Sequence, residues 1–352
     1  MKSPQELLLF AERLGAVEEV ECVTPDLNGV PRGKTMTAEG FLAGRRLQMA
    51  RGVLLQCLMG GYPPARFYGG EDGDLLLRPD PRQIHLLPWS ATPRALAICD
   101  ALELDGSPCA LSTRGLLRRV LADYAALGLT PVVATELEFF VFAPNPDPRE
   151  PFQPPLGLDG RRENGAAAFS VGAQSGLQPF FAEVYRGMAA LGLPRDTFMH
   201  EMGTSQFEIN FPHGDALRLA DQTFLFKHLL REVALRHGLL AVCMAKPLGG
   251  VPGSSMHLHQ SVLDGDGRIL DCLRRVDFEM SEQRQVLPGL YYRLPPPMDR
   301  VNPFACPPDE LAVLLAQRPQ DKTFDRWLLD TFGGLSPLVC RELTVRLLGA
   351  LD

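Results

Sequence analysis

Two glutamates lie two positions apart within an apolar stretch of the sequence. Glu136 and Glu138 belong to PVVATELEFFVFA, residues 131–143, whose valines and phenylalanines are typical of a buried strand. Side chains at positions i and i+2 of a strand share a face, so both carboxylates are expected on one side. Two carboxylates on a buried strand need a compensating cation. A half-exposed strand edge would also accommodate them and is the alternative interpretation.

Two more glutamates flank a short turn. Glu201 and Glu208 belong to FMHEMGTSQFEINF, residues 198–211, which predicts two strands around a glycine-containing turn, with His200 just before the first glutamate. If this hairpin closes, both carboxylates face the same way. Ordinary surface carboxylates on a hairpin are the alternative.

An HxH pattern supplies imidazoles. His257 and His259 lie in SSMHLHQSVLD, residues 254–264, a predicted strand that would carry both rings on one face. Taken alone, the pattern also fits histidines that are satisfied within a core. Together, four carboxylates and one or two imidazoles on three strands suit Mg²⁺ or Mn²⁺. Two such cations suit phosphoryl transfer, because they neutralise charge on the transferred group.

Composition limits the class of protein. The 352 residues carry a net charge of −7, with 45% hydrophobic and 22% charged residues, which excludes wholesale disorder and argues against non-specific nucleic-acid binding. No run of apolar residues is long enough for a transmembrane helix. The N-terminal 15 residues predict an amphipathic helix and not a signal peptide, and no CxxC pair suggests a zinc ribbon. Reduced thiols and a cytoplasmic location are therefore expected.

Periodicity and turn residues predict an α+β protein. Helices are expected at residues 1–15, 112–127, 178–192 and 216–237, and in the tail at 308–316, 321–332 and 337–349. Strands are expected at 17–24, 34–37, 72–80, 83–89, 94–102, 131–143, 198–211 (as a hairpin), 239–247 and 254–264. A turn joins the first two at 25–29, and a long loop rich in proline and glycine covers 144–167.

The motifs resemble the glutamine synthetase family. The resemblance rests on ELEFFVF (136–142), HEMGTSQFEINF (200–211), ADQTFLFKHLLREVALRHGL (220–239) and MAKP followed by PGSSMHLHQS (244–261). The γ-glutamyl-polyamine synthetase branch is the most similar, and PDLNGVPRGK (25–34) with GDLLLRPD (73–80) resembles its N-terminal domain. Residues 10–263 are covered. The resemblance implies an N-terminal β-grasp domain at 1–105 and an incomplete α/β catalytic domain at 106–263, built on a curved antiparallel sheet.

The same resemblance implies an activity in nitrogen metabolism. Glutamate would be joined to ammonia or an amine at the expense of ATP, through γ-glutamyl phosphate, with Mg²⁺ or Mn²⁺ bound at two sites. Which amine is used stays open, because the acceptor pocket is expected to involve the 144–167 loop. Family members form rings in which the N-terminal domain completes a neighbour's active site, so a homo-oligomer with active sites between subunits is expected.

Residue roles follow from the same resemblance. Metal ligands would be Glu138, Glu201 and Glu208 at the site nearer glutamate, and Glu136 and His257 at the site between the ATP phosphates. Glu136, Glu208 and His257 would thus be catalytic. His259 and Ser261 would lie near ATP, and Gly253, Ser254 and Ser255 near the backbone of glutamate, with Lys246 and Pro247 on the adjoining strand and loop.

One part of the family pattern is missing. The family continues beyond HxHxS with an Asn-Arg motif, spaced arginines and Arg-x-Glu-x-Arg, which grip glutamate, stabilise the transferring phosphoryl group and complete one metal site. The sequence RELTVR at 341–346 has a different spacing and a helical context. One metal site is therefore expected to be incomplete, and the loss of such a charge clamp lowers rates by orders of magnitude.

The tail resembles a different family. DGDGRILDCLRRVDFEMSEQRQVLPGLYYRLPPP, VNPF and FGGLSPLVCREL, within residues 264–352, resemble the NFACT (fibronectin-binding-protein-like) family of ribosome quality-control factors. A mostly helical tail and a chimeric or truncated chain are the corresponding hypotheses, and a divergent synthetase tail is the alternative. The alternative function is a catalytically impaired metal-binding fusion whose tail contacts the ribosome, RNA or another protein, although the tail carries no basic footprint for RNA.

Overall fold

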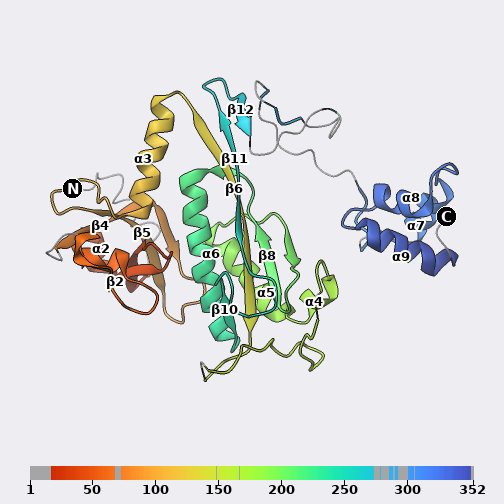
Figure 1. Ribbon diagram of the computed structural model, residues 1–352, viewed down its shortest axis with the longest axis horizontal. Coiled ribbons are helices and arrows are strands. Elements are labelled where there is room, and N and C mark those ends of the chain that lie inside the picture. The colour runs from red at the N-terminus through yellow and green to blue at the C-terminus, as the bar shows by residue number, and fades with distance from the viewer. Residues whose placement is uncertain are drawn as a thin grey trace. The chain divides into compact units, whose positions relative to one another are not determined.

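The computed structural model describes residues 17–67, 73–147, 149–165, 167–272, 278, 285–287, 290–291, 300–304 and 306–349. The chain divides into two compact units (Figure 1): Met1–Arg275 with Val286–Tyr292, and Val276–Gln285 with Arg293–Asp352. The helix predicted at residues 1–15 lies outside the described residues. The secondary structure confirms the predicted α+β class and a mostly helical tail.

The first sheet of the larger unit has five strands. They are β1 (Glu19–Pro25), β2 (Pro31–Thr37), β3 (Leu47–Ala50), β4 (Asp74–Leu86) and β5 (Arg94–Leu102), in the order β2-β1-β5-β4-β3. Strands β1 and β5 are parallel neighbours, and the other strand pairs are antiparallel, an arrangement typical of a β-grasp domain. Short helices α2 (Ala38–Leu42), η1 (Arg51–Leu55) and η2 (Ala65–Phe67) connect them.

The prediction of two strands at 72–80 and 83–89 is wrong. A single strand, β4, runs from Asp74 to Leu86 through parts of both segments, and its register against β5 shifts between Pro79 and Ile84. Proline has no backbone N–H to donate, so Pro79 and Pro81 interrupt the ladder without ending the strand. The turn predicted at 25–29 is confirmed, because the buried Asp26 carboxylate accepts hydrogen bonds from the backbone of Asn28 at 2.8 Å and Val30 at 2.9 Å.

The second sheet has seven strands and is antiparallel throughout. Its main path is β12-β11-β6-β8-β7, formed by β6 (Thr130–Phe142), β7 (Phe198–His200), β8 (Gln206–Asn210), β11 (Met256–Leu263) and β12 (Ile269–Cys272). The short strands β9 (Gly214–Asp215) and β10 (Leu240–Val242) also pair with β6. The predicted hairpin at 198–211 is confirmed as β7 and β8, whereas the strand expected at 239–247 ends at Val242.

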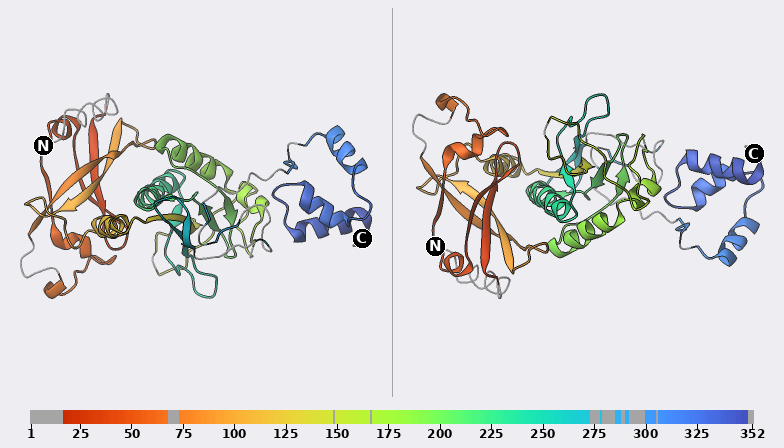
Figure 2. Two further views of the ribbon diagram at one scale, coloured as in Figure 1. Left: turned by 90° about the horizontal axis from the view of Figure 1, so that it is seen from above. Right: turned by 90° about the horizontal axis from the view of Figure 1, so that it is seen from below.

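One face of this sheet packs into a hydrophobic core of the larger unit. Leu137, Phe139 and Val141 alternate along β6 and pack against α5 (Gln178–Leu191) and α6 (Ala216–Arg236). These two helices lie side by side against the sheet in Figure 1 and Figure 2. Side chains alternate between the faces of a strand, so this burial directs the intervening residues of β6 to the opposite face.

Capping residues fix the ends of the long helices where the sequence predicts them. The side chain of Ser112 caps α3 (Thr113–Ala126), and that of Asp215 caps α6. Each accepts a backbone N–H that the first helical turn cannot satisfy. Gly128 and Gly238, just beyond the helix ends, have left-handed backbones with φ of 71° and 63°, which glycine adopts at little cost. The short α4 (Val171–Ser175) precedes α5.

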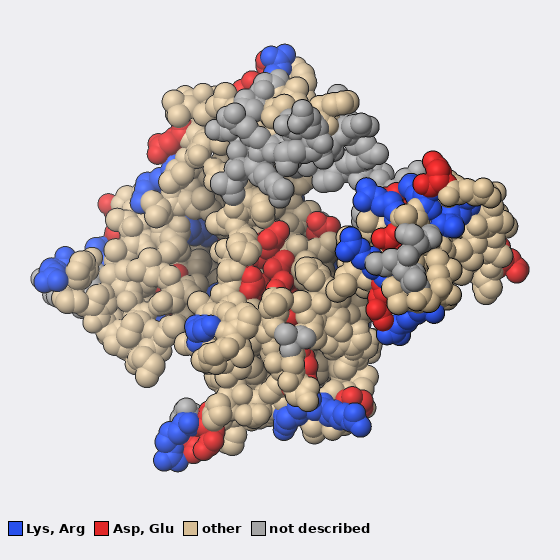
Figure 3. All heavy atoms as spheres, turned by 45° about the vertical axis from the view of Figure 1, so that its right-hand side comes forward, with Lys and Arg blue, Asp and Glu red and all other residues tan. Residues whose placement is uncertain are grey.

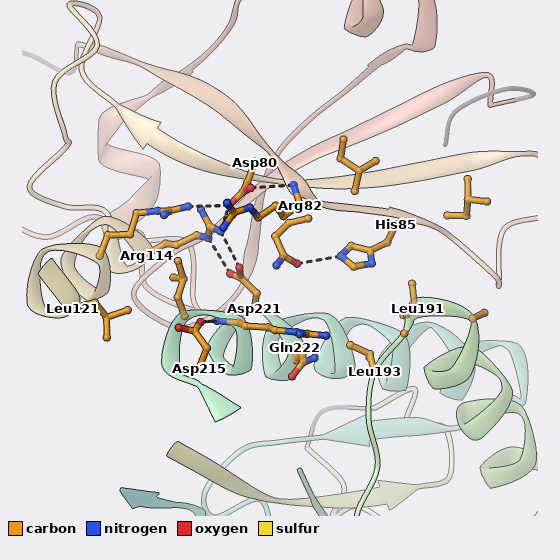
Figure 4. A pocket seen from close by; sticks show the side chains of 18 residues that line it. Asp80, Arg82, His85, Arg114, Leu121, Leu191, Leu193, Asp215, Asp221 and Gln222 are labelled. Carbon is orange, nitrogen blue, oxygen red and sulfur yellow. Dashed lines mark hydrogen bonds and ion pairs between the residues drawn. The ribbon is translucent and has the colours of Figure 1, made fainter. Parts of the chain in front are cut away.

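A buried arginine ties the first sheet to helix α6. Arg114 is 4% exposed, and its guanidinium donates to Asp221 of α6 at 2.9 and 2.8 Å. It also donates to Asp80 of β4 at 2.6 Å and to Asp100 of β5. Figure 4 shows Arg114 between Asp80 and Asp221. Burial would lower the pKa of Arg114, but the bonds to these carboxylates outweigh it and raise the pKa. The three aspartates are thus paired with a cation inside the protein.

The smaller unit has a core of its own. It contains α7 (Pro308–Ala316), α8 (Phe324–Thr331) and α9 (Pro337–Leu348). Phe324, Trp327, Leu328, Phe332 and Cys340 are buried together. The predicted tail helices are confirmed, with α8 shorter than expected. Across the described ranges, none of the helices combines the length and apolar character needed for a membrane span.

Replacing Arg114 by alanine should lower the free energy of unfolding by about 3–5 kcal/mol. The buried carboxylate of Asp221 would lose its guanidinium partner, and Asp80 and Asp100 would keep only the more exposed Arg118. The matched control is Arg118→Ala. Arg118 contacts Asp80 and Asp100 at 2.8 and 3.1 Å, but its side chain is 42% exposed, so its loss should cost about 1 kcal/mol or less. Urea unfolding of both variants measures the difference. Equal losses would contradict a structural role specific to the buried arginine.

Candidate functional site

The face of the second sheet opposite its core carries three of the predicted acidic side chains. Glu136 of β6 lies directly across from His257 of β11, and Glu138 lies directly across from Glu208 of β8. Directly opposed residues of antiparallel strands point to the same side. The register therefore confirms that three strands bring these side chains to one face. Figure 3 shows acidic side chains gathered in a hollow of the surface.

Three side chains approach closely enough to share a cation. One ligand atom each of Glu136, Glu208 and His257 lies within 4.8 Å of the other two. Two oxygens on opposite sides of a bound Mg²⁺ are about 4 Å apart. Small side-chain movements would therefore bring these three ligand atoms to binding distance of one ion. Glu136 also lies between two imidazoles, 3.3 Å from Nδ1 of His257 and 3.1 Å from Nε2 of His259.

The electrostatics of Glu208 indicate a missing positive charge. Burial, and then the negative charges of Glu136, Glu201 and Glu138, together raise the pKa of Glu208 to about 7. Glu208 lies among these carboxylates and is only 6% exposed. Among the described residues, none of these four glutamates forms an ion pair with lysine or arginine, in contrast to the aspartates around Arg114. The donor set therefore fits a hard divalent cation that would replace the missing charge.

Glu138 is held by neutral donors. Ser255 donates its hydroxyl to Oε1 of Glu138 at 2.6 Å, and the amide of Gln206 donates to Oε2 at 3.0 Å. Both bonds stabilise the ionised carboxylate and fix its orientation. Ser255 also lies 3.2 Å from Nε2 of His257, so it connects two of the predicted ligands.

Glu201 lies in the turn between β7 and β8 and not on a strand. Its backbone N–H donates to the carbonyl of Gln206 at 2.8 Å, and its Oε2 accepts the backbone N–H of Met202 at 3.1 Å. Its charge reaches Glu208, although it is outside the closest group of three. The resemblance assigns Glu138, Glu201 and Glu208 to one metal, and Glu136 and His257 to the other. The three side chains that lie closest together here come from both sets: Glu208 from the first, and Glu136 and His257 from the second. The assignment of ligands to two metals stays a prediction.

The remaining predicted residues lie along the same strands. Ser261 shares the face of His257 and His259, two pairs farther along β11 opposite Val132. The carbonyl of Gly253 and the buried hydroxyl of Ser254 face the amide of Gln206 at 3.0 and 3.3 Å. All the predicted site residues thus belong to the larger unit, and the roles inferred for them stay predictions.

Sequence reasoning missed two polar residues of β8. Gln206 is 1% exposed and bonds to Glu138, to the Gly203 N–H and to residues 253 and 254. Asn210, in the amide orientation that satisfies its neighbours, donates to Glu208 at 2.8 Å. The period of two along Gln206, Glu208 and Asn210 was the available signal, because these residues must share one face.

The fold and the site define a class of protein: an α+β protein that carries carboxylates and imidazoles on one face of a sheet and can bind hard divalent cations there. Residues 110–291 match the family model described as glutamine synthetase, catalytic domain. The chain therefore belongs to the glutamine synthetase family, as its motifs predicted. Residues 261–350 match a second model, described as NFACT N-terminal and middle domains, which confirms the resemblance of the tail.

Curated relatives agree with this family. A glutamine synthetase of Pyrococcus abyssi is 32% identical over 245 residues, covering 69% of this chain and 51% of the relative. A glutamine synthetase of Mycolicibacterium smegmatis is 34% identical over 199 residues, or 55% and 43% of the two chains. A glutamate–isopropylamine ligase of a Pseudomonas species is 32% identical over 266 residues, or 72% and 54%. The chain spans about half the length of these relatives.

Solved structures share the fold. A crystal structure titled novel glutamine synthase homolog has a TM-score of 0.62 and 26% identity, covering 72% of this chain and 57% of that chain. A structure titled GmaS/ADP complex has a TM-score of 0.61 and 27% identity, covering 77% and 58%.

Substituting Glu138 or Glu208 by alanine should abolish the binding of Mn²⁺, because each change removes a buried carboxylate from the proposed metal-binding face. Isothermal titration of the full chain measures the affinity. The matched control is Glu150→Ala, which removes an exposed glutamate of the 144–167 loop and should leave the affinity unchanged. Unchanged affinity in both site variants would refute the site assignment.

The stability of the metal-free protein should fall as the pH rises from 5 to 8. The pKa of Glu208 in the folded protein is raised from its usual 4.5 to about 7, so between these values the folded state keeps a proton that the unfolded state has already lost. The expected loss is on the order of 2–3 kcal/mol. Thermal unfolding in EDTA measures it. Glu208→Gln should remove this part of the pH dependence, and an identical profile in both proteins would contradict the prediction.

Proposed function

We propose that the chain carries the glutamate- and ATP-binding face of a ligase that joins the γ-carboxylate of glutamate to ammonia or an amine. The observation that supports this most strongly is the convergence of Glu136, Glu208 and His257 within the segment that matches the glutamine synthetase catalytic domain. Because the chain spans about half of its relatives, the complete reaction is a proposal for this chain.

The proposed chemistry has two steps. An oxygen of the γ-carboxylate attacks the γ-phosphorus of ATP, and the bond from that phosphorus to ADP breaks. The nitrogen of the amine then attacks the carbonyl carbon, phosphate leaves with the electron pair of the broken C–O bond, and the nitrogen releases a proton. A divalent cation, when bound, would neutralise charge on the phosphates.

The protein's own residues would hold these reactants. We assign Glu136, Glu138, Glu201, Glu208 and His257 as the ligands of Mg²⁺ or Mn²⁺. The nucleotide would lie toward His259 and Ser261, and the backbone of glutamate toward Gly253, Ser254 and Ser255. The bonds from Ser255 and Gln206 to Glu138 support this arrangement, because they hold its carboxylate oriented before a cation or substrate arrives.

The names of the relatives suggest the substrates. The Pseudomonas relative is named as a ligase for isopropylamine, and a solved relative is titled as an ADP complex. We therefore propose ATP as co-substrate and either ammonia or an amine as acceptor, with the polyamine branch as the finer hypothesis. A cytoplasmic homo-oligomer with active sites between subunits is proposed from the family alone.

A second candidate function rests on the tail. The smaller unit has a separate hydrophobic core, and residues 261–350 match the NFACT model. Under this hypothesis the chain is a fusion of two families, binds a metal without turnover and uses the tail to contact the ribosome or another partner. The different spacing of RELTVR at 341–346 from the family's Arg-x-Glu-x-Arg pattern is consistent with this candidate.

Release of ADP should distinguish the two candidates. With Mg²⁺ or Mn²⁺ and ATP, the ligase should release ADP only when glutamate is present, and faster with ammonia or one member of a panel of small amines and polyamines. Glu136→Gln should reduce this rate by at least about a hundredfold, because it removes a negative ligand without changing its size. A folded, metal-binding protein that shows no turnover would instead support the second candidate.

A further inference from the structure

One acidic residue of the long loop contacts both ends of the turn that carries Glu201. Oε2 of Glu163 lies 3.0 Å from Nε2 of His200, at the end of β7. The same oxygen accepts the backbone N–H of Ser205 at 3.0 Å, just before β8. Glu163 therefore joins two points of the chain that are separated by the whole turn.

The first of these contacts leads directly to Glu201. His200 is fully buried, and its other ring nitrogen, Nδ1, lies 2.7 Å from the backbone carbonyl of Glu201. The backbone of Phe169 also donates to the carbonyl of His200 at 2.8 Å. The imidazole thus connects the carboxylate of Glu163 to the peptide group of Glu201.

The second contact supports an unfavourable backbone conformation. Ser205 has a φ of 57°, in the left-handed region that residues other than glycine seldom adopt. Its N–H donates to Glu163, and its hydroxyl donates to the carbonyl of Val141 at 2.7 Å. Such conformations persist only where the surroundings fix them, and they cluster at functional sites.

The carboxylate of Glu163 destabilises the folded state locally. Its Oε1 is buried and has no hydrogen-bond partner among the described residues. A buried polar atom without a partner destabilises the folded state. A role in orienting the turn would explain why a carboxylate occupies this position.

We propose that Glu163 is a positioning residue, which fixes the turn between β7 and β8 so that Glu201 presents its carboxylate to the metal. This inference rests on the proposed function of the site and extends it to a residue that does not touch the metal. Residues that orient metal ligands contribute about 10–100-fold to metal affinity. The proposal therefore concerns the affinity for a divalent cation and not only the stability of the fold.

Mn²⁺ affinity of the full chain, measured by titration and by electron paramagnetic resonance of the bound ion, tests the proposal. Glu163→Ala should weaken binding about 10–100-fold. Glu163→Gln keeps the length of the side chain and an oxygen that can accept the backbone N–H of Ser205, and it should bind nearly as tightly as the unchanged protein. The matched control is Asp159→Asn, in an exposed turn of the same loop where the carboxylate accepts the backbone of Arg161 at 3.0 Å, and it should have no effect.

A double-mutant cycle separates positioning from other effects. If Glu163 acts through Glu201, Glu163→Ala should cause no further loss of affinity in a protein that already carries Glu201→Ala. Additive losses would overturn the proposal, and so would equal losses in the alanine and glutamine variants, because the charge alone would then explain them. Circular dichroism in EDTA verifies folding, and Glu163→Asp replaces the alanine variant if that protein does not fold.

The outcome also separates this inference from the proposed function. If Glu138→Ala and Glu208→Ala abolish binding but Glu163→Ala does not weaken it, only the positioning role is wrong. If none of the variants affects Mn²⁺ binding, the metal site and the positioning role are both wrong.

Discussion

Repulsion among glutamates on one side of β6 and β8 is the constraint on which the rest of the site depends. Leu137, Phe139 and Val141 are fixed in the core by two helices, so Glu136 and Glu138 cannot turn away from Glu208 without breaking the packing. Burial and, after it, the charges of the neighbouring glutamates raise the pKa of Glu208. A fold that buries like charges together is stable only with protons, donors or a cation between them.

The larger unit resolves buried charge in two ways. Around Arg114 three aspartates share a guanidinium, and the result is a permanent connection between the first sheet and α6. On the carboxylate face, the donors described for Glu138 are a hydroxyl and an amide, from Ser255 and Gln206. Neutral donors orient carboxylates without neutralising them. The face therefore keeps an attraction for an exchangeable cation, which membership of the glutamine synthetase family also leads us to expect.

Much of this could be predicted from the sequence, because alternation along strands is a local property. The spacing of Glu136 and Glu138, and of His257 and His259, was enough to assign each pair to one face, and the caps of α3 and α6 were equally local. The continuity of β4 through two prolines was not predictable, since it depends on pairing with β5. Spacing could place Gln206 on the strand face of Glu208, but not its bond to Glu138, 68 residues away along the chain. The contacts of Glu163 are likewise 37 and 42 residues away, and no spacing rule encodes them.

The central claim is that this face binds a divalent cation through the side chains that the sheet brings together. Crystals of the full chain grown with Mn²⁺ and ADP, with anomalous diffraction measured at the manganese absorption edge, test it most directly. The account predicts an anomalous peak within about 2.5 Å of ligand atoms of Glu136, Glu208 and His257. A protein that crystallises with Mn²⁺ elsewhere, or with no peak on this face at saturating Mn²⁺, would contradict it.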